Sequence, residues 1–172
     1  MTDSRIVVYF DMDESEPPVP ASVVGKYDIL QPIVGYFSNC GFEVGDLTNW
    51  TTFVNPSSGT NATVVSTAYY GNHGCQLSAI PTGAWCSGFI RPATLVMADG
   101  DKLRFRYKVG QSEGSNQFMV WLGESGEDNY LLVDVTSPAT GDWVEVSMNV
   151  EDFPAHIIKD NVNLIFYVFA GV

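Results

Sequence analysis

Few residues of this chain have the types and the spacing that catalysis requires. The two histidines, His73 and His156, lie far apart, and neither stands in a metal-binding or hydrolase motif. The stretch Gly123-Glu124-Ser125-Gly126 differs from the G-x-S-x-G motif, in which a serine sits between a strand and a helix. The 20 Asp and Glu residues include no pair that spacing marks for glycoside hydrolysis. The sequence therefore predicts a protein that is not an enzyme.

Aromatic rings beside polar groups are the residues of this chain that could bind a sugar. Pyranose faces stack on exposed rings, while the sugar hydroxyls need hydrogen-bond partners. The candidates are Trp85 after the turn Pro81-Thr82-Gly83, the pair Tyr69 and Tyr70, and Tyr130 beside Glu127, Asp128 and Asn129. Trp50, Trp121 and Trp143 are interpreted as core residues, because an aromatic at strand spacing usually packs inside. A glycan platform is predicted at Trp85, Tyr69 and Tyr70.

A second candidate surface is basic. In residues 102–109 apolar and basic side chains alternate, as expected for a strand with one buried face. The basic side chains are Lys102, Arg104, Arg106 and Lys108, half of the 8 Lys and Arg in the chain. This basic face could dock an acidic partner, or it could pair with acids on neighbouring strands, such as Asp134 and Glu145.

Composition narrows the class of protein further. A formal charge of −12 disfavours nucleic acid and anionic membranes as partners, since phosphate groups are bound by concentrated Lys and Arg. No signal peptide is evident at the start, and no apolar run is long enough to cross a membrane. The odd number of cysteines predicts buried free thiols in a protein made in a reducing cytoplasm. These cysteines are Cys40, Cys75 and Cys86.

From residue 39 onward, short apolar segments separated by Gly, Pro, Asn and Asp predict an antiparallel two-sheet β-sandwich. The predicted strands are residues 50–54, 62–69, 75–80, 84–90, 101–109, 116–122, 129–135, 143–150 and 162–170. One helical turn is expected within 151–158, with Pro154 near its start. Residues 39–172 are assigned to this sandwich.

Residues 1–38 are predicted to form an extended N-terminal arm with edge strands. The arm begins with a strand-like run, Arg5, Ile6, Val7, Val8, Tyr9 and Phe10. Acids and prolines follow in 11–20, which favours an extended linker. A second apolar run, 27–37, contains Pro32 and Gly35, which suit an edge strand better than a central one.

Several segments of residues 39–170 together resemble the jelly-roll β-sandwich of carbohydrate-binding modules and galactose-binding-like domains, a fold also seen in phage capsid decoration proteins. The segments are 39–43 with Trp50, then 74–77, 100–105, 143–146 and 163–166. The resemblance implies an all-β jelly roll. It also implies a structural calcium ion, held by Glu43 and by an aspartate of a last strand.

The last strand of that family is expected to begin near residue 170, so one sheet would be a strand short. An open sheet edge presents unpaired donors and acceptors. We expect the strand of residues 5–10 to fill such a vacancy, in its own domain or in a neighbouring subunit.

These observations predict a non-catalytic structural accessory of a virion, made in the host cytoplasm and located on the virion surface. In this interpretation a decoration or cement protein binds the major capsid protein, or another shell protein, through its sandwich and N-terminal arm. A symmetric homo-oligomer, with a trimer as the plausible form, is expected. The alternative is a carbohydrate-binding module that recognises a glycan through exposed aromatics.

Overall fold

The computed structural model describes residues 5–12, 42–69, 71–92, 95–123, 130–157 and 162–171. Their regular structure is β, with two short 3-10 turns. The strands are β1 (Arg5–Met12), β2 (Trp50–Phe53), β3 (Thr60–Val65), β4 (Gly74–Ala79), β5 (Cys86–Pro92), β6 (Lys102–Glu113), β7 (Asn116–Gly123), β8 (Tyr130–Thr136), β9 (Val144–Asn149) and β10 (Asn163–Ala170). A strand lies within or across each of the nine segments predicted from the sequence.

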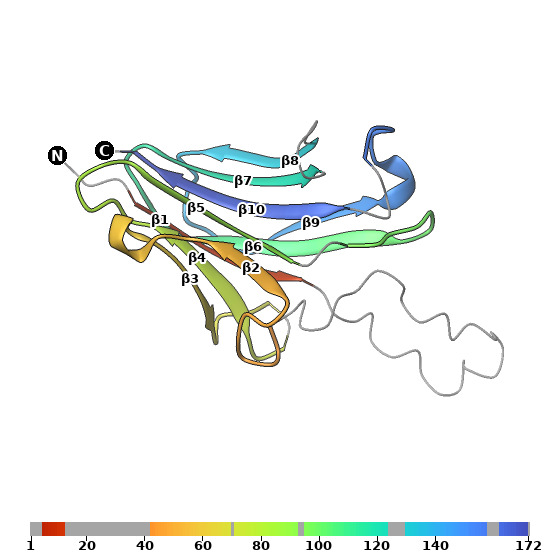
Figure 1. Cartoon of the computed structure of the whole chain (residues 1–172), viewed down its shortest axis with the longest axis horizontal. Helices are drawn as coiled ribbons and strands as arrows, with labels where there is room; N and C mark the ends of the chain where they lie inside the picture. The colour runs from red at the N-terminus through yellow and green to blue at the C-terminus, as the bar shows by residue number, and fades with distance from the viewer. Residues whose placement is uncertain are drawn as a thin grey trace.

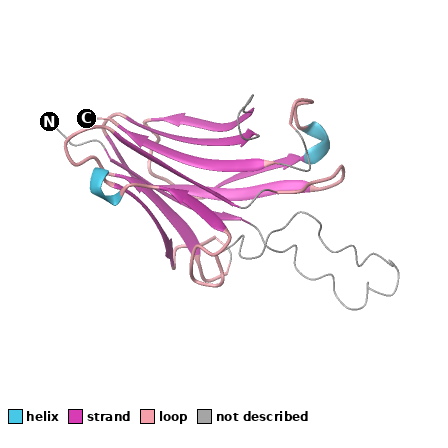
Figure 2. Ribbon diagram, viewed as in Figure 1, coloured by secondary structure: helices cyan, strands magenta, loops and turns pink. Residues whose placement is uncertain are grey.

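The strands form two antiparallel sheets that face each other (Figures 1 and 2). The first sheet has the order β3-β4-β1-β6-β9 and the second has the order β2-β5-β10-β7-β8. The predicted fold class, an all-β antiparallel two-sheet sandwich, is therefore confirmed.

The strand pairings are nested along the chain. β7 pairs with β8, β6 with β9 and β5 with β10, so each pairing encloses the previous one and the pairs alternate between the sheets. This order is the connectivity of a jelly roll. The next strand outward is β4, which pairs with β3 on one side and with β1, the first strand of the chain, on the other.

β1 lies in the interior of the first sheet, not at an edge as predicted for the strands of the N-terminal segment. It pairs antiparallel with β4 on one side and with β6 on the other. Ile6 and Val8 are fully buried in the core between the sheets, which explains why this strand occupies a central position. Residues 13–41, including the predicted linker and the apolar run 27–37, lie outside the described residues.

Gly110 allows β1 and β6 to lie together. The register shifts between Val7, opposite Gln111, and Val8, opposite Val109, so Gly110 is left without a partner across the ladder. A Cβ atom at this position would lie 2.3 Å from the Tyr9 ring. The small residue is therefore required by the close approach of Tyr9.

Aromatic contacts tie the two sheets together in the core. The rings of Phe105 in the first sheet and Phe166 in the second meet edge to face, with centroids 5.1 Å apart. Trp50 stacks on Phe42 at 4.6 Å and also lies near Phe166 at 6.2 Å. The predicted core position of Trp50 is confirmed.

The helical turn predicted within 151–158 is shorter and earlier than expected. It is the 3-10 turn η2, Val150–Asp152, and Pro154 follows it. Phe153 is extended, with φ −64° and ψ 142°, because the residue before a proline avoids the helical region. In the part of the chain that the structure describes, no helix is long and apolar enough to cross a membrane.

The interior position of β1 leads to a stability prediction. Replacement of Ile6 by Ala should lower the free energy of unfolding by about 2–4 kcal/mol, since it leaves a cavity in the core. Urea denaturation measures this change. Thr63→Ala, on the exposed side of β3, is the control and should change stability by less than about 0.5 kcal/mol. Equal effects of the two substitutions would contradict the central placement of β1.

Candidate functional site

The outer face of the second sheet is apolar. In β5, β7 and β10 the core-facing residues, such as Ile90, Val120 and Phe166, are fully buried, so the alternate residues point outward. Those outward residues, together with apolar side chains of β2, β8 and the turn before β5, form a surface that we call the aromatic face. Its members are Phe53, Trp85, Phe89, Met119, Trp121, Leu131, Ile165, Tyr167 and Phe169.

Strand register places the members of the aromatic face side by side. Phe89 lies opposite Phe53 on one neighbouring strand and opposite Tyr167 on the other. The rings of Phe53 and Phe89 stack at 4.4 Å, and those of Trp121 and Tyr167 stack at 5.4 Å. The side chains therefore form one continuous surface across the five strands.

Solvent exposure distinguishes this surface from an ordinary sheet face. Antiparallel sheets usually turn polar side chains outward. Here Trp85 is 64% exposed, Phe53 50% and Leu131 42%, and the other members are half-buried. Two charged residues lie among them. Arg91 sits over the Phe53 ring, with its guanidinium carbon 5.8 Å from the centroid, and Asp134 accepts a hydrogen bond of 2.6 Å from Gln117 Nε2.

The structure separates the residues that were predicted to form a glycan platform. Trp85 lies on the aromatic face, with its ring 6.2 Å from that of Phe169. Tyr69 lies elsewhere, over Arg106 of the first sheet. Tyr70 and residues 124–129 lie outside the described residues, and Tyr130 packs against the core.

The interpretation of Trp121 and Trp143 as core residues is wrong. Both are half-buried and neither belongs to the buried core. Trp121 lies on the aromatic face, and Trp143 contacts the Tyr69 ring edge to face at 6.0 Å. A sequence signal for the aromatic face did exist, since residues 164–170 of β10 are apolar at every position instead of at every second one.

The basic face of β6 is present, but one of its four cations, Arg106, forms an ion pair within the first sheet. Arg106 is 8% exposed and forms an ion pair with Glu145, the residue opposite it on β9. Its guanidinium carbon lies 4.1 Å from the centroid of the Tyr69 ring. The cross-strand pairing predicted with Glu145 is confirmed, whereas the pairing with Asp134 is wrong because Asp134 belongs to the other sheet.

The other three cations of the basic face lie opposite uncharged or aromatic residues. Lys102 faces Asn149 and Arg104 faces Ser147 on β9, while Lys108 faces Tyr9 on β1. Docking of an acidic partner on this surface stays a prediction.

Glu43 binds the backbone of a loop. Its carboxylate accepts hydrogen bonds from the backbone N–H of Asn72 at 2.9 Å and of His73 at 3.0 Å. Gly71 makes this approach possible, since its φ is +67° and a Cβ there would lie 2.2 Å from Glu43 Oε1. The arrangement joins the segment before β2 to the turn before β4. His73 thus lies in a structural turn, with its buried Nδ1 lacking a hydrogen-bond partner.

The turn that follows Glu43 is held by a hydrogen bond between Thr48 and the side chain of Asp46. Thr48 donates its backbone N–H to Asp46 Oδ1 at 2.8 Å. The side-chain and backbone hydrogen bonds from Thr48 lower the pKa of Asp46 below its usual value. No group of three or more His, Cys, Asp or Glu side chains that could hold a metal ion occurs in the described ranges. Calcium at Glu43 stays a prediction.

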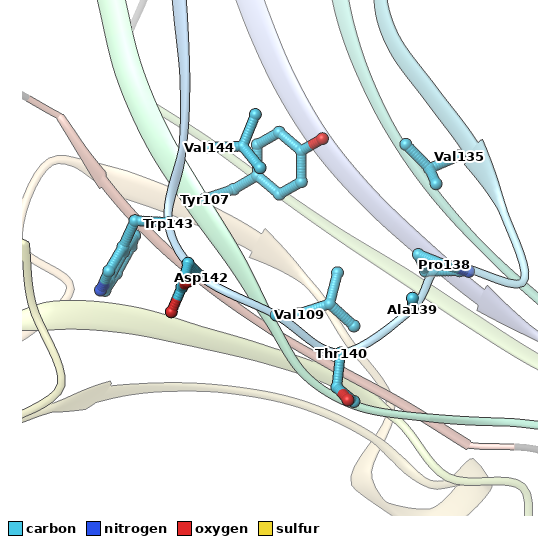
Figure 3. Close-up of a pocket in the computed structure, with 10 residues that line it drawn as sticks. Tyr107, Val109, Val135, Pro138, Ala139, Thr140, Asp142, Trp143 and Val144 are labelled. Carbon is cyan, nitrogen blue, oxygen red and sulfur yellow. The ribbon is translucent and has the colours of Figure 1, made fainter.

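A cavity of about 350 Å³ lies between the sheets beside the β8–β9 connection (Figure 3). Tyr107 and Val109 of β6, Val135 of β8 and the segment 138–144 line it. Its wall is mainly apolar, and burial raises the pKa of the Tyr107 hydroxyl. Asp142 and Thr140 are exposed at the same connection.

The predicted buried free thiols are confirmed for Cys75 and Cys86. Burial raises the pKa of both thiols, which disfavours the reactive thiolate. Cys40 lies outside the described residues.

Comparisons with protein-family models, with curated proteins and with solved structures found no match to this chain.

The contacts of Glu43 can be tested by a substitution that keeps its shape. Glu43→Gln should lower the free energy of unfolding by roughly 1 kcal/mol, because two charge-assisted hydrogen bonds to an exposed loop are weakened. Urea denaturation at neutral pH measures the loss. The control is Asp142→Asn, which should stay within about 0.5 kcal/mol of the unmodified protein. A calcium-dependent rise in melting temperature that Glu43→Gln abolishes would support the metal instead.

Proposed function

We propose that this protein is a non-catalytic structural accessory of a virion, a decoration or cement protein that docks on the capsid surface. The aromatic face carries the proposal. It is a broad apolar sheet face, with the charged side chains of Arg91 and Asp134 beside its members, on a protein whose net charge is −12. Such a face suits burial against another protein, since exposed apolar patches are energetically costly and often mark interaction sites.

The size of the face favours a partner that presents many equivalent sites. Five strands about 4.8 Å apart and three rows of outward residues give a patch of roughly 300–400 Å². A stable interface of standard size buries about 800 Å² per partner, so one face alone would bind weakly. Copies joined to one another would bind a repetitive shell much more tightly, because the later contacts become intramolecular.

The proposed partner is the major capsid protein or another shell protein, and the proposed location is the virion surface. A symmetric homo-oligomer such as a trimer would match the local symmetry of a shell. In this proposal the protein buries apolar surface and performs no chemistry.

Docking through the aromatic face predicts a loss of particle binding when its exposed rings are removed. Trp85→Ala combined with Phe53→Ala should weaken binding on the order of tenfold or more, because exposed aromatics at an interface often contribute more than 1 kcal/mol each. Co-sedimentation with particles from the native source measures the binding.

Tyr69→Ala is the matched control for this experiment. Tyr69 is 47% exposed, close to the value for Phe53, but it lies in the β3–β4 connection and its ring contacts Arg106 of the first sheet. Binding should be unchanged in the control. Equal losses in both variants, or no binding of the unmodified protein to particles, would overturn the proposal.

The aromatic face also supports a second candidate function, that of a carbohydrate-binding module. The exposed ring of Trp85 next to Phe169 provides an apolar platform, and Gln117 and Ser87 lie opposite Phe169 on the two neighbouring strands. Rings for stacking and polar groups for hydroxyls are the two requirements of sugar binding.

A glycan array distinguishes this second function from docking on a shell. The carbohydrate-binding function predicts saccharide binding that Trp85→Ala reduces at least tenfold and that Tyr69→Ala leaves unchanged. An array without signal for the unmodified protein would eliminate this candidate and leave the shell proposal standing.

A further inference from the structure

β1 lies between β4 and β6. In the nested strand order of a jelly roll, the strand at this position would come after β10 in sequence. The nested pairs β7–β8, β6–β9 and β5–β10 lead outward to β4, whose partner in this order would follow β10. β1 takes that place and pairs with β4 over Ile6–Phe10. The first strand therefore completes a sheet that is otherwise built from later parts of the chain.

The groups seen to hold β1 in the described part of the chain belong to those later parts. Asn116 Nδ2 donates to the Arg5 carbonyl at 3.0 Å, and the Arg5 side chain lies 3.6 Å from the Glu113 carboxylate. Ile6 and Val8 are buried among core residues of both sheets. Among the described residues, the slot between β4 and β6 is therefore built from parts of the chain that lie far from β1 in sequence.

The covalent connection of β1 to the rest of the fold is by far the longest. Residues 13–49 separate β1 from β2, which is 37 residues, whereas the next longest connection, between β9 and β10, has 13. Phe42 is buried in the core, so 29 residues, 13–41, lie between it and β1, and 29 residues can span at most about 100 Å when fully extended. The slot of a neighbouring copy is therefore within reach of β1.

We propose that β1 is exchanged between copies of this chain, so that Arg5–Met12 of one copy lies between β4 and β6 of another. The partner is a second copy because the slot recognises this strand through the register seen within one chain. The proposal goes beyond docking on a shell, since it needs only copies of this chain and does not use the aromatic face.

The balance between the two arrangements depends on concentration. Exchange replaces each contact of β1 with an identical contact, so the ladders favour neither arrangement. The covalent connection gives an effective concentration of roughly millimolar order, which favours the strand of the same chain in dilute solution. The exchanged arrangement is therefore favoured over the arrangement within one chain when the protein is concentrated, or when several copies assemble into a closed symmetric ring.

Disulfide trapping between two variants, each with one introduced cysteine besides the buried Cys75 and Cys86, tests the exchange in the full chain. Val7 and Ser78 lie opposite each other on β1 and β4. Val7→Cys and Ser78→Cys, both made with Cys40→Ser, are mixed, unfolded and refolded together at increasing protein concentration, and then oxidised. We expect a disulfide-linked dimer of the two variants whose yield rises with concentration.

Two further proteins make every outcome decisive. The control mixture is Val7→Cys with Ser147→Cys. Ser147 lies on β9, opposite Arg104 and not next to β1, so this mixture should give no linked dimer. The double variant Val7→Cys with Ser78→Cys shows that the bond can form. If the double variant closes only within single chains and the mixture gives no dimer at any concentration, the proposal is overturned.

A second opposed pair, Tyr9→Cys with Gln76→Cys, repeats the test in case Val7 cannot be replaced. Failure of the exchange would leave particle binding through the aromatic face unaffected, so the two proposals can fail separately.

Discussion

The antiparallel ladders that β1 makes with β4 and β6 hold the first sheet together. Without β1, the edges of β4 and β6 would face an open slot, and the core side of the second sheet would lose the cover that Ile6 and Val8 supply. Unpaired backbone groups at an open slot are costly when buried and prone to pairing when exposed. The same physical requirement explains the interior position of β1 and the proposal that copies exchange it.

The two outer faces of the sandwich have opposite chemistry. On the first sheet, Arg106 is held between Glu145 and the Tyr69 ring, so its charge is satisfied internally. On the second sheet, aromatic side chains cover the strands and stack on one another. Burial of apolar surface against a partner makes the free energy of binding more favourable, whereas burial of an ion pair that is already formed contributes little. This difference is why binding is proposed on the second sheet.

Of the aromatic face, sequence reasoning predicted Trp85 alone, and the position of the face was not predicted. The turn before Trp85 predicts an exposed ring, and the alternation along residues 102–109 predicts that Arg106 can pair with an acid such as Glu145 on a neighbouring strand. Trp121 was misplaced because a strand predicts two alternating faces without saying which of them is covered by another layer. In β10 both faces are apolar, so alternation carries no information there.

The sequence by itself determined the fold class and the strands from residue 50 onward, because apolar alternation and turn residues act over a few neighbouring positions. Only the tertiary structure decided where Arg5–Met12 belongs, since pairing partners more than 60 residues apart leave no local pattern. It also decided that Glu43 binds the turn at Asn72 and that six aromatic rings meet on one outer face. Those outcomes depend on strand order and register, which arise when the two sheets pack around a common core.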